Sequence, residues 1–296
     1  MSLFTFSFKK YIITFLLIFI IGSSSFIIFS ELIINNFVLK KSLYENLKVK
    51  FHKINKFDYV AFADSHGANG LKDTKDFINF SMHGDNLIAI SEKILYFIEN
   101  KNFKGIILQA DAHQFASYRV FKNQTNLSND FLEKDNFLFN FMRPPYRQFI
   151  VSYWGSFFKK FVIKTSEVRE KNNIENKINN DIEKVLLQRV EMHKPISNFK
   201  KTIYAKKFKN LIKILNNKNV KVCLISFPLN KNYRKLIEKN KIFNEVNKFY
   251  SDLAIENNLK YFNFSSSLRE KYFADPDHLN ENGSEYFTKL VLKSCF

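Results

Sequence analysis

The residues best suited to chemistry fall in two short segments that are far apart in the chain. Ser65 stands in Ala-Asp-Ser-His-Gly at 63–67, directly after the apolar run 59–62, and Asp-Pro-Asp-His occupies 275–278. A serine hydroxyl becomes a nucleophile when a histidine takes its proton and a carboxylate orients that histidine. We therefore expect Ser65 to be the nucleophile, His278 the general base and Asp275 the orienting group. Asp277 can either replace Asp275 or cap the final helix.

Acyl transfer also requires N–H donors for the oxyanion that develops on the substrate. The backbone amides of Ser65 and Gly84 are the candidates, because a glycine after the second predicted strand admits close approach of a substrate oxygen.

The elements that must position these residues alternate along the chain. The pattern predicts strands at 59–63, 77–81, 105–108, 220–226 and 260–264, and helices at 87–100, 206–216, 232–256 and 282–293. A loop through Gly67 and Gly70 is expected after the first strand. This alternation predicts a parallel five-stranded sheet between helical layers, with sites at the carboxyl ends of the strands.

The alternation stops at about 116–198. We interpret this stretch as an insertion, with a charged helix near 168–193. Its aromatic residues would cover the site, lie on a membrane or pack the insertion onto the domain.

Residues 11–29 carry no charge, and a helix of that length reaches nearly 30 Å, enough to cross a bilayer. Lys9 and Lys10 precede the run, so the positive-inside rule keeps the N-terminus in the cytoplasm. We expect a cytoplasmic tail (1–10), a transmembrane signal anchor (11–34), a connector (35–56) and a periplasmic or extracellular domain (57–296). The alternative is a cleaved signal peptide, for which residues 22–25 supply small side chains.

Composition adds two points. The net charge of +18 suggests anionic partners, although the abundance of Phe, Lys, Asn and Ile is equally typical of an AT-rich genome. An exported domain would not meet nucleic acid, which we do not expect as a partner.

The cysteines at 223 and 295 either form one bridge or remain a buried and a loose thiol.

At these motifs the chain resembles the SGNH (GDSL-type) hydrolase superfamily. Residues 63–65 resemble its first block with alanine for glycine, 79–85 its second block, and 275–278 its fifth block, Asp-x-x-His. The resemblance implies a three-layer α/β/α fold of flavodoxin-like type and a serine esterase or O-acyltransferase that needs no cofactor.

The third block departs from the family pattern. Where the family has an asparagine that donates to the oxyanion, this chain reads Gln-Ala-Asp at 109–111. An ionised Asp111 there would repel an oxyanion, so the third donor is Gln109, His113 or Gln114, or it is absent. The residues that would support the site are Asp64, Gln109, Asp111, His113 and Asp277.

The anchor followed by an exported domain is similar to membrane-tethered proteins that add or remove acyl groups on cell-surface polymers. That similarity is one of architecture, and the substrate of those proteins does not carry over. We expect acyl groups, acetyl in the first place, on a cell-surface polysaccharide or related polymer as substrate. A multi-spanning membrane acyltransferase that supplies the acyl group is a further expected partner, which would explain the anchor. The altered third block favours another hypothesis, a catalytically weak module that binds a glycan or an assembly partner. Four cations would then bind phosphate or carboxylate groups of the polymer: Arg143, Arg147, Lys231 and Arg234.

A metal-dependent phosphoesterase is a further alternative. Asp/His pairs recur at predicted strand ends, and carboxylate with imidazole is a ligand set for two-metal sites. The pairs are Asp64 with His66, Asp85 with His83, Asp111 with His113, and Asp275 with His278.

Overall fold

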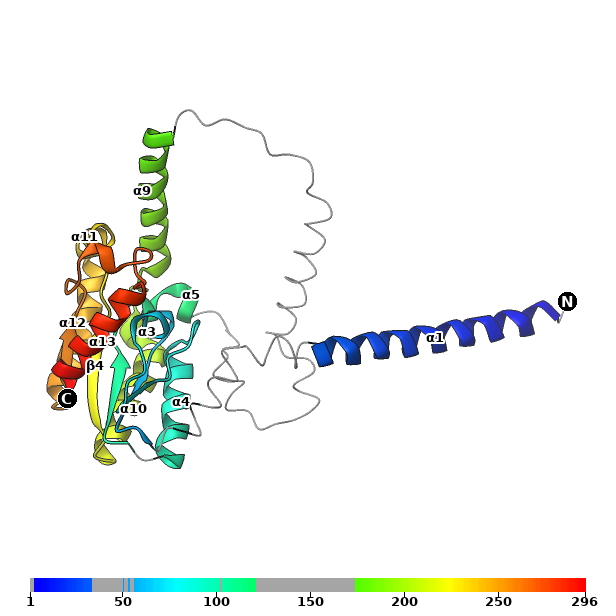
Figure 1. The fold of residues 1–296 in the computed structure, drawn as a ribbon, viewed down its shortest axis with the longest axis horizontal. Coiled ribbons are helices and arrows are strands. Elements are labelled where there is room, and N and C mark those ends of the chain that lie inside the picture. Colours follow the sequence, from blue (N-terminus) through cyan, green and yellow to red (C-terminus); the bar gives the residue numbers. More distant parts are fainter. Residues whose placement is uncertain (1–2, 34–49, 51–52, 54–55, 102, 121–173) are drawn as a thin grey trace.

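The computed structural model describes residues 3–33, 50, 53, 56–101, 103–120 and 174–296. A parallel sheet lies among the helices that follow residue 56 (Figure 1). The strands are β1 (Tyr59–Phe62), β2 (Phe77–Asn79), β3 (Gly105–Gln109), β4 (Lys221–Ser226) and β5 (Lys260–Asn263). Their order is β2-β1-β3-β4-β5 and every neighbouring pair is parallel. The predicted parallel five-stranded sheet is confirmed, with strand ends shifted by one or two residues.

Helices cover both faces of the sheet, because successive side chains along a buried strand point to opposite faces. Val60 and Phe62 of β1 pack in the cluster that includes α4 (Leu87–Asn100), α10 (Ile203–Asn217) and α12 (Lys241–Glu256). Ala61 and Ala63 pack in the cluster of α13 (Glu281–Cys295) on the other face. The three-layer α/β/α arrangement is therefore present.

The expected loop after β1 is wrong. Residues Ser65–Gly70 form a short helix, α3, whose first residue is Ser65. Asp64 caps it by accepting a hydrogen bond from the His66 N–H, which is the usual role of aspartate at this position. Gly67 allows α3 to approach the end of β2, because a side chain there would overlap Ser81. Because α3 begins at Ser65 directly after β1, Ser65 lies at the carboxyl edge of the sheet.

The single helix expected at 232–256 is also wrong. It is divided into α11 (Lys231–Glu238) and α12, with the break at Lys239 and Asn240. The side chain of Asn240 accepts from the Ile242 N–H and so starts a new helix, a capping signal that hydrophobic periodicity does not reveal. Glu238 and Asn244, on either side of the break, line one cavity with the last residues of β4 and β5.

The remaining elements surround the site or precede the domain. They are α1 (Leu3–Ile33), η4 (Ala112–Phe115), α5 (Ser117–Val120), α9 (Ile174–His193), η5 (Phe199–Lys201) and η6 (Glu270–Tyr272). The uncharged run lies in α1, and in the described part of the chain no helix has both the length and the apolar character needed to cross a membrane. Most of the predicted connector and insertion, with Arg143 and Arg147, lie outside the described residues.

A disulfide joins Cys223 of β4 to Cys295 at the end of α13. Both cysteines are buried, and the bridge links the last helix to β4, which lies between β3 and β5. Of the two arrangements that the sequence left open, the structure contains the bridged one.

Candidate active site

Ser65, His278 and Asp275 lie together at the carboxyl edge of the sheet. His278 Nε2 is 3.1 Å from Ser65 Oγ, and His278 Nδ1 is 2.8 Å from Asp275 Oδ2. An ionised carboxylate can only accept, so Nδ1 carries the ring proton and Nε2 is left to accept from the serine hydroxyl. This is the hydrogen-bond order that activates a serine.

Asp275 also shapes the loop that carries the histidine. Its Oδ1 accepts from the backbone N–H groups of Asp277 and His278, at 3.0 and 2.9 Å. The His278 carbonyl accepts from the Ala274 N–H, which closes the loop. One carboxylate therefore fixes both the backbone of the loop and the ring of His278.

Asp277 does not cap the final helix, since the side chain of Asn280 caps α13 by accepting from the Gly283 N–H. Asp277 points inward, and its side chain is almost fully buried. Its nearest oxygen is 3.6 Å from His278 Nδ1, against 2.8 Å for Asp275, so Asp275 is the better placed to orient the ring.

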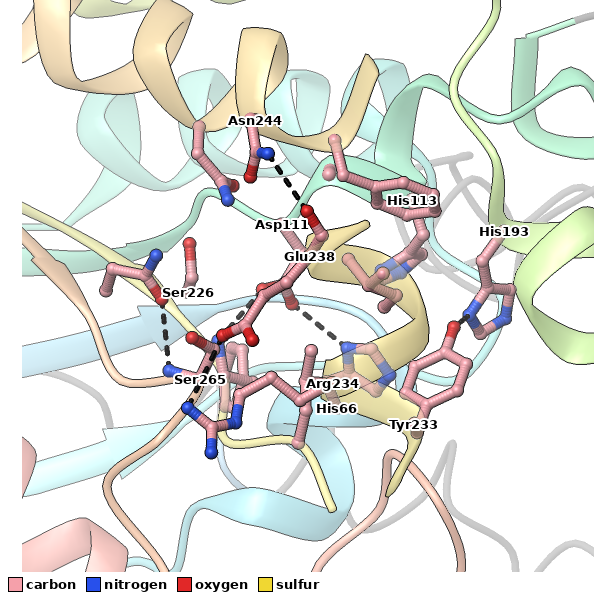
Figure 2. Close-up of a pocket in the computed structure, with 17 residues that line it drawn as sticks. His66, Asp111, His113, His193, Ser226, Tyr233, Arg234, Glu238, Asn244 and Ser265 are labelled. Atoms are coloured by element: carbon pink, nitrogen blue, oxygen red, sulfur yellow. Dashed lines mark hydrogen bonds and ion pairs between the residues drawn. The ribbon is translucent and has the colours of Figure 1, made fainter. Parts of the chain in front are cut away.

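His66 lies between two carboxylates. Its Nδ1 is 3.0 Å from Asp111 Oδ2, a contact drawn in Figure 2, and its Nε2 is 3.1 Å from Asp277 Oδ2. Burial opposes a charge on this ring, but the nearby Asp64 carboxylate and the hydrogen bonds to Asp111 and Asp277 raise the pKa of His66 well above its usual value. Both ring nitrogens of His66 face carboxylate oxygens, and an ionised carboxylate can only accept, so both nitrogens carry a proton and the ring is an imidazolium. His66 connects the segment of Ser65 to the histidine loop.

A second buried carboxylate, Asp64, is surrounded by donors. Its Oδ2 contacts His113 Nε2 at 2.6 Å, Arg119 Nη2 at 2.8 Å and Gln114 Nε2 at 2.9 Å. Although burial acts in the opposite direction, the charges of His113 and Arg119 hold the pKa of Asp64 well below its usual range. Asp64 is therefore a fixed negative charge at the end of β1, and it anchors the chain on either side of Ser65.

The sequence left open whether a third oxyanion donor comes from Gln109, His113 or Gln114 or is absent, and the structure directs these three side chains to other groups. Gln109 Nε2 donates to both Asp64 Oδ1 and Asp111 Oδ2, while His113 and Gln114 contact Asp64. Asp111 itself accepts from the Phe227 N–H and Gln109 as well as facing His66. Gln109 and Asp111, the residues of the altered third block, belong to one buried hydrogen-bond network. This network includes Asp64 and His66, the two neighbours of Ser65.

The backbone amides of Ser65 and Gly84, which we expect to bind the oxyanion, are available as hydrogen-bond donors. Within the described ranges, neither the Ser65 nor the Gly84 N–H donates to another group. Gly84 lies in an exposed turn with a φ of +83°, a conformation that favours glycine, and a methyl group there would meet no neighbour within 4 Å.

Four site residues lie outside the sequence prediction. Arg189 of α9 places Nη2 2.7 Å from Asp277 Oδ1 and 3.4 Å from His278 Nδ1, and Arg119 of α5 contacts Asp64. His193 Nδ1 is 2.7 Å from the Tyr233 hydroxyl, and burial lowers the pKa of His193 to about 2 (Figure 2). Neither arginine stands in a recognisable motif, so only the tertiary structure reveals their roles.

Some of the side chains proposed as metal ligands lie close together in the structure. Asp64, His66 and His113 have ligand atoms within 4.8 Å of one another, and so do His66, Asp277 and His278. Asp85, however, is paired with the buried Lys93 at 2.6 Å, and His83 is exposed. Two of the eight residues proposed as metal ligands are thus directed elsewhere.

Comparisons with known proteins give likenesses in structure alone. No protein-family model and no curated protein matches the chain. It is similar to a candidate acylhydrolase from Bacteroides fragilis (10% identity, 86% of this chain and 97% of that one, TM-score 0.46) and to a GDSL-like lipase from Bacteroides thetaiotaomicron (10%, 86% and 97%, 0.43). It is also similar to a lipase/acylhydrolase from Enterococcus faecalis (11%, 80% and 94%, 0.38). Because these identities and TM-scores are low, the function of the chain has to be argued from its own side chains.

Proposed function

We propose that the chain is an SGNH-type serine hydrolase or acyltransferase with Ser65 as its nucleophile. The observation that carries the proposal is the position of His278, which contacts Ser65 Oγ at 3.1 Å with one ring nitrogen and Asp275 at 2.8 Å with the other. These residues come from segments more than 200 positions apart: Ser65 follows β1, and His278 lies in the loop between η6 and α13. They meet at the carboxyl edge of the sheet, where open α/β folds hold their ligands.

In this mechanism Ser65 Oγ attacks the carbonyl carbon of an acyl ester while its proton passes to His278 Nε2. Asp275 accepts from Nδ1–H and stabilises the imidazolium that forms. His278 then returns the proton to the departing alcohol, which leaves an acyl group on Ser65. In the second half of the reaction, water or a sugar hydroxyl gives its proton to His278 and attacks the acyl carbon. The bond between this carbon and Ser65 Oγ breaks, and His278 returns the proton to Ser65 Oγ.

The oxyanion is bound by the amides of Ser65 and Gly84 in this proposal. The Ser65 amide is at the first turn of α3, where an N–H has no partner within the helix. Each donor of this kind contributes about 3 to 4 kcal/mol to transition-state stabilisation. With two donors the site would turn over more slowly than one with three.

The proposed substrate is an acyl group, acetyl in the first place, on a cell-surface polysaccharide or related polymer. The proposed location is outside the cytoplasm, on an anchor formed by residues 11–34. The uncharged run 11–29 supports the anchor. The bridge between Cys223 and Cys295 supports an oxidising compartment, because structural disulfides are rare in the cytosol. A multi-spanning acyltransferase that supplies the acyl group remains part of the proposal.

The test is hydrolysis of an acetyl ester and labelling by a fluorophosphonate, measured on the wild-type chain, on Ser65→Ala and on metal-stripped protein. The proposal expects both signals in the wild type and in the stripped protein, and neither in Ser65→Ala. Labelling that persists in Ser65→Ala would exclude the serine mechanism.

The same experiment weighs the two alternatives. The metal-dependent phosphoesterase is favoured by the two groups of Asp and His side chains that share His66, and it expects activity that chelation abolishes and a divalent cation restores. A glycan-binding module with weak catalysis expects no ester hydrolysis and no labelling in any sample.

A further inference from the structure

We propose that a basic groove beside the histidine loop binds the carboxylate or phosphate groups of an anionic glycan. The groove has a volume of about 500 Å³ and is formed by the start of α11 and by the segment between β5 and η6. Four cations line it, namely Lys231, Arg234, Arg269 and Lys271, against one acidic side chain, Glu270. This surplus of positive charge in a concave site favours an anion.

The cations of the groove are poorly neutralised by the protein. Within the part of the chain that the structure describes, Lys231, Arg269 and Lys271 form no ion pair, and Arg234 has one, to Glu238 at 3.4 Å. The Nε of Arg234 is buried without a hydrogen-bond partner among the described residues. A guanidinium has five N–H donors in a planar fork, so Arg234 retains donors for a carboxylate or phosphate.

A second hollow adjoins the groove and has a different chemistry. This cavity, of about 150 Å³, shares Leu229 and Arg234 with the groove. Figure 2 shows Arg234 in its wall, ion-paired with Glu238, and Asn244 and Ser265 also line it. Side-chain amides and hydroxyls both donate and accept, as neutral sugar hydroxyls require. A ligand that places an anionic group in the groove and a sugar ring in the adjoining cavity would be an acidic glycan.

Backbone hydrogen bonds connect the groove to the histidine loop. The Asn230 N–H, just before α11, donates to the Pro276 carbonyl at 3.0 Å, and Lys271 is four residues before Asp275. Leu229, which lines both hollows, donates its N–H to the Ser265 carbonyl at 3.1 Å. A glycan held in the groove therefore lies beside the loop that positions His278, which suits a polymer substrate that extends past the reacting ester.

The inference rests on the proposed function for the choice of a glycan as ligand, and its test must therefore measure binding without turnover. The Ser65→Ala chain serves this purpose. Since the whole protein carries a net charge of +18, any polyanion will associate weakly with its surface, and a charge-matched control is needed.

The experiment measures the affinity of the Ser65→Ala chain for three oligosaccharides: oligogalacturonate, its neutral methyl ester and a phosphorylated mannose oligomer. It is repeated after adding Arg234→Gln and Lys271→Gln, and after adding Lys213→Gln and Lys293→Gln, two exposed lysines of α10 and α13 outside the groove. Losing two charge-assisted contacts in the groove should weaken binding of a charged oligomer at least about tenfold. The control pair should change it less than about twofold, and the methyl ester should bind no variant.

Selective binding of the carboxylate or of the phosphate oligomer identifies which anion the groove takes. An equal loss in both variant pairs would overturn the proposal, since binding would then follow net charge. Binding to anionic phospholipid vesicles but to neither charged oligomer would overturn it in favour of a membrane surface. Because binding is measured on Ser65→Ala, failure here leaves the serine mechanism to be judged by labelling alone.

Discussion

His66 Nε2 lies 3.1 Å from Asp277 Oδ2, so the residue after Ser65 is hydrogen-bonded to the residue before His278. The other ring nitrogen of His66 contacts Asp111 at the end of β3. Three segments that meet at the sheet edge are thus joined through one buried imidazolium. The contacts of His66 hold the segment of Ser65 next to the loop of His278, and the two residues themselves meet through their side chains.

The first prediction concerns His66 as a positioning residue. His66→Gln removes the charge from between two buried carboxylates, so we expect the fluorophosphonate labelling rate to fall about tenfold or more. We also expect the free energy of unfolding to fall by roughly 3 kcal/mol, because a buried charge loses its partner. Labelling kinetics and urea denaturation measure these effects. His83→Gln, on an exposed histidine, is the stability control and should change unfolding by less than about 0.5 kcal/mol. Unchanged labelling in His66→Gln would refute the positioning role.

The second prediction concerns pH. The pKa of Asp277 is held below its usual range by His66 and the nearby histidines despite burial, so its contribution to stability is present above about pH 4 and is lost as the pH falls. The raised pKa of His66 acts in the opposite sense, and its contribution is complete below about pH 6.5 and is lost as the pH rises through the raised value. The difference in unfolding free energy between wild type and Asp277→Asn should therefore be largest near neutral pH. A difference that grows on acidification would contradict this assignment.

The third prediction separates the two aspartates of the histidine loop. Asp275→Asn retains an Oδ1 that can accept from the two backbone N–H groups but loses the charge that orients His278. Loss of an orienting carboxylate lowers the rate of a serine enzyme by roughly 10⁴-fold. We expect ester hydrolysis to fall to this extent with little change in melting temperature. A larger rate loss in Asp277→Asn than in Asp275→Asn, at equal stability, would assign the orienting role to Asp277.

The fourth prediction concerns the disulfide. The bridge closes a loop of 72 residues between Cys223 and Cys295, for which chain-entropy arguments give about 4 kcal/mol of stabilisation. Cys223→Ala with Cys295→Ala should lower the free energy of unfolding by about this amount. Labelling of Ser65 in the folded variant should be unchanged, because neither cysteine lies in the site. Identical unfolding of the wild type with and without a reducing agent would show that the bridge does not form.

The fifth prediction concerns Lys93 and Asp85, which pair at 2.6 Å with both side chains almost fully buried. Burial lowers the pKa of Lys93, while Asp85 opposes this shift. Lys93→Met leaves the Asp85 carboxylate without this cation and should destabilise the fold by about 3 to 5 kcal/mol. The double variant with Asp85→Asn should recover part of the loss. Additive losses would show that the two side chains are not coupled.

Hydrophobic periodicity and the order of the motifs were enough to predict the sheet and the meeting of Ser65, His278 and Asp275 at its carboxyl edge. Apolar runs such as 105–108 predicted the strands, and the motifs at 63–67 and 275–278 placed Ser65 and His278 at one edge of the sheet. Features that depend on single polar side chains were missed. Asp64 caps a helix where a loop was expected, and Asn240 divides a helix that periodicity made continuous. The contacts of Arg119 and Arg189 depend on how distant segments fold together, which spacing along the chain does not encode.

The most direct test of the central claim is to locate the residue that a fluorophosphonate modifies, by mass spectrometry of the labelled full-length chain. We expect one modified peptide with the phosphonate on Ser65, a labelling rate strongly reduced in Asp275→Asn, and no label in Ser65→Ala. Modification at another residue, or a rate in Asp275→Asn equal to that of the wild type, would contradict it.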